Sequence, residues 1–135
     1  MSGRLLPLTR SMHSWHPEPE ALLLVSTTVA DEGAARQLAA LALEHRLAAC
    51  VQVGRIESHY VWEGAPVQEP EQRLLFKTTV AAQPALERLL LTHHPYALPM
   101  VVAEPLVAVS PAYRAWVLEA IRPQAGGQAG TVLAD

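Results

Sequence analysis

Residues 48–79, AACVQVGRIESHYVWEGAPVQEPEQRLLFKTT, decide the fold of this chain. Strand-forming residues dominate positions 48–61, and WEGAP at positions 62–66 supplies the residues of a tight connection. Positions 72–79 are again rich in apolar and β-branched residues and predict a return strand. The stretch therefore predicts a β-hairpin with an antiparallel ladder.

Toward the N-terminus, the run at positions 21–27 is continuously apolar and β-branched, which is typical of a strand buried on both faces or at an interface. Asp31 then precedes a long segment rich in Ala and Leu with a helical stripe. Because an aspartate side chain accepts hydrogen bonds from the first backbone N–H groups, we expect Asp31 to cap this helix.

Toward the C-terminus, apolar residues at helical spacing predict a second helix over positions 82–93. Pro95 disfavours helical geometry in the residue before it, so this helix is expected to end near His94. The apolar stretch 100–107 reads as a strand, and Pro99 and Pro105 place it at a sheet edge or at a bend.

A last helix is expected after Ser110 and Pro111, which suit its cap and its first turn. The predicted order is β-α-β-β-α-β-α, an α/β (α+β) fold with helices on one face of an antiparallel sheet, a split β-α-β sandwich. The apolar strands exceed what one layer of helices can cover. The second face of the sheet is therefore predicted to be buried against another copy of the chain.

Composition restricts the partners. The chain has 135 residues, a net charge of −3 and a single cysteine. Without clustered Lys and Arg we expect no nucleic-acid partner and no membrane association, and one cysteine excludes an internal disulfide. With no export signal recognised, the expected location is the cytoplasm. The working domain is predicted at 21–122, with flexible tails at 1–20 and 123–135.

Five short motifs resemble the CutA divalent-cation tolerance family in order and spacing. They are RLAACV at 46–51, YVWEG at 60–64, KTT at 77–79, HHPY at 93–96 and PAYRAW at 111–116. The resemblance implies a ferredoxin-like fold, a tight homotrimer built like the PII signalling proteins, and a role in tolerance of divalent cations, especially copper.

The chain departs from the family pattern in two places. Some members carry a cysteine at the end of the first strand, proposed as a copper ligand, where this chain reads VSTT at 25–28. Many members also carry a glutamate soon after the Pro-Tyr pair, where this chain has Ala97 and, further on, Met100. Any metal binding is therefore expected to be weak.

His93 and His94 are the candidate metal ligands, because imidazole nitrogen suits Cu²⁺ and Zn²⁺. Neighbouring helical residues point about 100° apart, so one ion uses both only if the helix has ended at His94. The alternative is structural, with His93 on the core face of the helix and His94 as its cap. Both interpretations remain open at this stage.

Lys77 is the only lysine, and a compact ammonium suits an anion or a carboxylate in a cleft. A ligand-binding or intersubunit role is one interpretation, and chance usage of one lysine is the other. Tyr60, Trp62 and Glu63 lie on the hairpin and are expected to build the trimer or to contact a ligand. Tyr96 is grouped with these cleft residues.

Cys50, Tyr113 and Trp116 are predicted to be structural, with Cys50 a small buried apolar side chain. No phosphate loop, nucleophile elbow or HExxH motif is present, so no enzymatic activity is expected. The predicted function is that of a homotrimer in metal-ion response that binds copper or another divalent metal weakly. The alternative function is a PII-like regulator that binds a small anion in clefts between subunits.

Overall fold

The computed structural model describes residues 17–123. Helices and strands follow one another in the predicted order. The bounds are β1 Leu22–Val29, α2 Glu32–Glu44, β2 Cys50–Trp62, β3 Ala65–Thr79, α3 Gln83–His93, β4 Val102–Pro105 and α4 Pro111–Ile121. The two predicted tails lie almost wholly outside the described residues.

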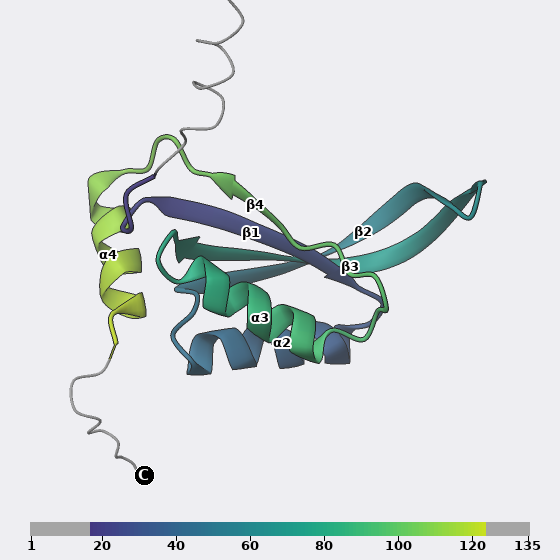
Figure 1. Cartoon of the computed structure of the whole chain (residues 1–135), viewed down its shortest axis with the longest axis horizontal. Helices are drawn as coiled ribbons and strands as arrows, with labels where there is room; N and C mark the ends of the chain where they lie inside the picture. The colour runs from purple at the N-terminus through teal and green to yellow at the C-terminus, as the bar shows by residue number, and fades with distance from the viewer. Residues whose placement is uncertain (1–16, 124–135) are drawn as a thin grey trace, which may run out of the picture.

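The four strands form one antiparallel sheet in the order β2-β3-β1-β4. Helices α2 and α3 lie side by side on one face of this sheet, as Figure 1 shows. The α+β class, the antiparallel sheet and the helical layer on one face are therefore confirmed. Strand β4 forms one edge of the sheet, as its flanking prolines predicted.

The core lies between the helices and the face of the sheet that they cover. Val25 and Phe76 are directly opposite each other on β1 and β3, and both are buried. Alternate strand residues point to one face, so this register directs the apolar residues of both strands toward the helices. The buried cluster is made of Val25, Val29, Ala35, Leu38, Ala42, Ala48, Leu74, Phe76, Leu86 and Leu90.

Both predicted ends of the helical layer are found. The Oδ1 atom of Asp31 accepts a hydrogen bond of 2.8 Å from the backbone N–H of Ala34, so Asp31 caps α2. Helix α3 ends at His93, and His94 has an extended backbone with ψ of 135°. Pro95 explains this stop, because its ring excludes helical geometry from the residue before it.

The hairpin turn is tighter and its return strand longer than expected. Glu63 and Gly64 have φ of 53° and 83°, the left-handed pair of a two-residue turn between antiparallel strands. Strand β3 begins at Ala65 and not at position 72. In the sequence, Pro66 and Pro70 argued against a strand at these positions. The structure tolerates them because this part of β3 has a neighbouring strand on one side only.

Residues 56–71 form a two-stranded ribbon, here called the arm. Pairing of β1 with β3 stops at Val29 and Gln72, whereas β2 and β3 continue to pair as far as Trp62 and Ala65. In Figure 1 this ribbon extends past the helices and past β1 to a tip. The arm therefore lies outside the helix-covered core.

The C-terminal third differs from the prediction in three details. Strand β4 is four residues long, shorter than the predicted 100–107, because Pro99 and Pro105 bound it closely. Ser110 makes no side-chain capping bond to α4, although Pro111 occupies the first turn as expected. Val117 is the one fully buried residue of α4 and Trp116 is exposed, so the apolar stripe expected at helical spacing in this helix is only partly buried; it consists of Tyr113, Trp116, Val117, Ala120 and Ile121.

Helices in the described part of the chain are short. Within residues 17–123, none combines the length and the apolar composition that a membrane crossing requires.

Candidate functional site

His94 lies where α3 ends, and both of its ring nitrogens have hydrogen-bond partners. Its Nε2 atom is 3.0 Å from the hydroxyl of Thr27 on β1, and its Nδ1 atom accepts the backbone N–H of Tyr96 at 3.1 Å. An N–H donor at Nδ1 requires a lone pair there, so the proton of the neutral ring is on Nε2 and points to Thr27. The ring therefore joins the helix end to β1.

Glu71 continues this chain of contacts into the arm. The hydroxyl of Tyr96 donates to its Oε2 atom at 2.7 Å, and the hydroxyl of Ser58 donates to its Oε1 atom at 2.6 Å. Glu71 is only 7% exposed. Since a buried carboxylate is costly unless it is hydrogen-bonded, the two hydroxyl groups stabilise it in place.

Ionisation in this network follows its surroundings. Burial lowers the pKa of His94, and a hydrogen bond to the backbone of Thr28 and the charge of Glu71 oppose that shift. Burial and the hydrogen bond to Glu71 raise the pKa of Tyr96. At neutral pH the imidazole is therefore neutral and the phenol protonated, which is the state that the hydrogen bonds require.

The two predicted metal ligands differ in their availability. His93 is exposed and does not lie in the core, because Leu86 and Leu90 make the buried stripe of α3. His94 has no free lone pair while Tyr96 occupies Nδ1 and Nε2 faces Thr27. Among residues 17–123, no group of three or more His, Cys, Asp or Glu gathers around one point. The described residues therefore do not supply the three or four protein ligands of a closed metal site.

Lys77 lies at the opposite end of the sheet. Its Nζ atom is 5.4 Å from the centre of the Tyr113 ring on α4, and Cys50 is its direct partner on β2. Lys77 follows Glu71 by six residues on β3, or about 20 Å at the rise of a strand. One protomer therefore does not bring Lys77 together with Tyr96, whose hydroxyl contacts Glu71.

The residues predicted to be structural are found near Lys77. The rings of Tyr113 and Trp116 lie 5.5 Å apart on α4. Cys50 is half-buried and not enclosed, because it begins β2, which forms an edge of the sheet.

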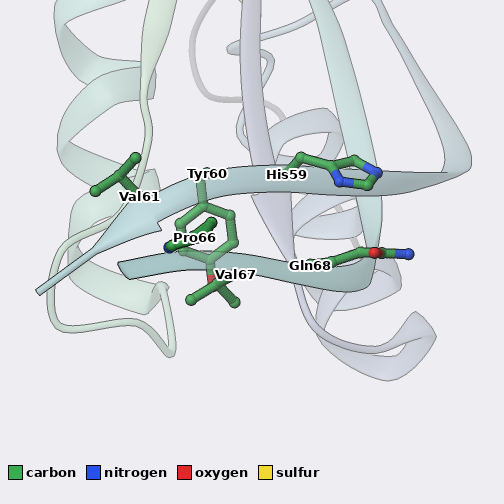
Figure 2. A pocket seen from close by; sticks show the side chains of 6 residues that line it. All are labelled: His59, Tyr60, Val61, Pro66, Val67 and Gln68. Atoms are coloured by element: carbon green, nitrogen blue, oxygen red, sulfur yellow. The ribbon is translucent and has the colours of Figure 1, made fainter. Parts of the chain in front are cut away.

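The remaining predicted residues lie on the arm. Tyr60 donates its hydroxyl to Glu69 on the neighbouring strand, and this hydrogen bond raises the pKa of Tyr60. Trp62 and Glu63 are at the tip, where both are exposed. An open hollow of about 420 Å³ lies on the arm and is lined by His59, Tyr60, Val61, Pro66, Val67 and Gln68, whose side chains are drawn in Figure 2.

Glu71 and Ser58 were missed by the reading of the sequence. The stretch containing Glu71 lacks apolar alternation, so positions 67–71 read as a loop and their strand partners were not considered. A usable signal was present. Two glutamates two residues apart, at 69 and 71, point to the same face once the segment is recognised as a strand.

Comparison with known proteins identifies the chain's relatives. A family model described as CutA1 divalent ion tolerance protein matches residues 23–120. The divalent-cation tolerance protein CutA of Escherichia coli O139:H28 is 38% identical over 103 residues, which cover 76% of this chain and 92% of that protein. These relatives are named for divalent-cation tolerance and not for an enzymatic activity.

Solved structures agree with this result. CutA from Synechococcus elongatus PCC7942 is 44% identical with a TM-score of 0.73, covering 81% of this chain and 97% of that chain. CutA1 from the psychrotrophic bacterium Shewanella sp. SIB1 is 35% identical with a TM-score of 0.71, and the match covers 77% of this chain and 97% of that chain. Their ferredoxin-like fold is the fold described above. The family match, the sequence identity and the shared fold place this chain in the CutA1 family of divalent ion tolerance proteins.

Proposed function

We propose that this CutA1-family chain contributes to tolerance of divalent cations in the cytoplasm as a homotrimer, without enzymatic activity, and that it binds a divalent metal ion weakly. The observation that carries the proposal is the exposed apolar surface at both edges of the sheet. At the β2 edge, Val53, Val61 and Trp62 are exposed, and at the β4 edge Val102 is half-exposed.

Self-association follows from the properties of such edges. Each edge strand has unpaired backbone groups on one side, and apolar side chains there favour pairing with another chain. The two edges differ from each other, so contact of one edge with the other edge of a second copy is heterologous. A heterologous contact that closes on itself forms a ring, and a trimer is such a ring.

Sedimentation velocity at micromolar concentration tests the assembly. We expect a trimer for the native chain and weaker association for Trp62→Ala at the arm tip. The matched control is Trp116→Ala, because both tryptophan residues are 49% exposed and Trp116 lies on α4, away from the arm. A stable monomer in the native chain would overturn the proposed assembly, and equal effects of both variants would remove the arm tip from it.

Weak metal binding is supported by the exposed imidazole of His93. One accessible nitrogen leaves the rest of the coordination shell to water, and recruiting His94 requires breaking one of its hydrogen bonds. Both requirements lower the affinity. Protons compete with metal for imidazole, so binding should also weaken below about pH 6.

Calorimetric titration with Cu²⁺ at neutral pH tests this proposal on the native chain, on His93→Ala and on the double variant His93→Ala/His94→Ala. We expect weak binding in the native chain, most of which is lost in both variants. Tight binding that persists in the double variant would place the metal elsewhere. An absence of binding in all three proteins would refute the metal proposal, and titration with inorganic phosphate would then test the small-anion alternative.

A further inference from the structure

The strand pairing within the arm does not by itself fix the angle between the arm and the rest of the sheet. From Glu71 back to Ala65, at the tip, strand β3 pairs only with β2. Residues 56–71 are therefore a two-stranded ribbon with no third strand beside them. An isolated two-stranded ribbon is marginally stable and twists strongly. A contact from the core is therefore needed if the ribbon is to keep a fixed angle to the sheet.

Glu71 is the position where such a contact acts. It is the first arm residue beyond the end of the β1 pairing, next to Gln72, which still pairs with Val29. Both of its carboxylate oxygens are used, one by Ser58 on β2 and the other by Tyr96. Among the side-chain hydrogen bonds of residues 17–123, the one from Tyr96 alone reaches the arm from elsewhere in the chain.

The other end of the contact is anchored in the core. Tyr96 donates its backbone N–H to Nδ1 of His94, and Nε2 of the same ring faces the hydroxyl of Thr27. Thr27 is fully buried on the central strand β1. A continuous path of hydrogen bonds thus runs from β1 through the loop after α3 to both strands of the arm.

We propose that the hydrogen bond from Tyr96 to Glu71 is a lock that fixes the direction of the arm, and that Tyr96 is thereby a positioning residue for self-assembly. The second half of this statement rests on the proposed homotrimer. A hydrogen bond to a charged, buried acceptor is stronger than a neutral one. An arm held at one angle also presents Val61 and Trp62 to a partner without the entropic cost of ordering a mobile ribbon on association.

The test compares Tyr96→Phe with Tyr60→Phe. Both substitutions remove one phenol hydroxyl from a glutamate, but the bond from Tyr60 to Glu69 lies wholly within the arm. Hydrogen exchange followed by mass spectrometry measures peptides covering 56–71. We expect Tyr96→Phe to accelerate exchange in the arm roughly tenfold, the size of one charge-assisted hydrogen bond, and Tyr60→Phe to have a much smaller effect.

Glu71→Gln provides a second variant that keeps the side-chain shape and removes its charge. It should accelerate exchange in the same peptides, while peptides of β1 and α2 keep the native rate in every variant. Unchanged exchange in Tyr96→Phe, or equal acceleration in Tyr96→Phe and Tyr60→Phe, would overturn the lock.

Sedimentation of the same proteins separates this inference from the proposed trimer. We expect Tyr96→Phe to dissociate at a higher protein concentration than Tyr60→Phe does. If the native chain sediments as a monomer, the proposed assembly fails, while the exchange comparison still decides whether the lock exists. If the arm loosens in Tyr96→Phe but the trimer is as stable as that of Tyr60→Phe, the positioning role is refuted and the lock is retained.

Discussion

At the scale of single residues, the ring of His94 makes contacts with two separate parts of the chain. His94 directly follows the last residue of α3, accepts the backbone N–H of Tyr96 and contacts the hydroxyl of buried Thr27. The two hydrogen bonds together need the neutral imidazole with its proton on Nε2. Protonation of Nδ1 would place two hydrogen atoms between this nitrogen and the backbone nitrogen of Tyr96. The folded state therefore disfavours the charged form of His94.

Stability should therefore depend on pH through His94. Its pKa is lowered on folding, mainly by burial, so the unfolded chain binds the extra proton first. The contribution of the neutral ring is complete above about pH 6.5 and is lost as pH falls through the folded pKa. Urea unfolding measures the free energy of unfolding at each pH. Between about pH 7.5 and about pH 5 this free energy should fall more steeply for the native chain than for His94→Gln.

A matched control for this prediction is His59→Gln. His59 is exposed on the arm and pairs with Glu57 at 3.2 Å, so it lacks the buried surroundings of His94. Replacement of His59 should leave the fall in the free energy of unfolding at acid pH as steep as in the native chain. An identical pH profile for the native chain and for His94→Gln would contradict the assignment.

At the scale of helices and strands, the sequence was informative wherever local chemistry decides the outcome. Asp31 and Pro95 marked the start of α2 and the end of α3, because capping and proline sterics act within a few residues. The arm could not be predicted in full. Residues 65–71 have no third strand beside them, and their more covered face carries Val67, Glu69 and Glu71, so polar residues there leave no hydrophobic period.

The candidate site was predictable only in part, for a related reason. His94 and Tyr96 belong to one motif, but their partners Thr27 and Glu71 come from two different strands. Finding those contacts requires the register of β1 against β3, which the sequence does not state. Lys77 illustrates the converse, since residue type alone grouped it with Tyr96, although within one protomer Tyr96 contacts Glu71, six residues away from Lys77 along β3.

Packing of α3 on the sheet gives a prediction for this element. Leu90 is 0% exposed within the core cluster, whereas its neighbour Leu91 is 49% exposed. Leu90→Ala removes buried methyl groups and leaves a cavity, so the free energy of unfolding should fall by about 2–5 kcal/mol. Leu91→Ala should change it by less than about 0.5 kcal/mol. Denaturant unfolding of the two variants measures the difference, and similar losses would contradict the packing described for α3.

At the scale of the whole molecule, the described protomer divides into a well-covered core and exposed surroundings. Val107, Leu98 and Val61 are among the most exposed large apolar residues, and all lie outside the helix-covered face. A trimer would bury part of this surface. Association and folding then become coupled, because a partner that binds only the folded chain stabilises it by mass action.

This coupling predicts a thermal midpoint that rises with protein concentration. Differential scanning calorimetry over a hundredfold concentration range should show the rise for the native chain and a smaller one for Trp62→Ala, whose arm tip lacks the indole. Trp116→Ala should behave like the native chain. A midpoint independent of concentration in the native chain would show that folding and assembly are not linked.

The two-residue turn at Glu63 and Gly64 also sets an order of events during folding. Strands β2 and β3 are adjacent in sequence, so their ladder can close from the turn on the microsecond timescale typical of hairpins. Strand β1 pairs with β3 and with β4 only across long intervening segments, and such distant contacts close slowly. The ladder of β2 and β3 is therefore expected to begin forming before the core does, as a marginally stable ribbon whose apolar tip is exposed throughout that interval. Rapid completion of the sheet, or early capture of the tip by a second chain, then decides between productive folding and aggregation.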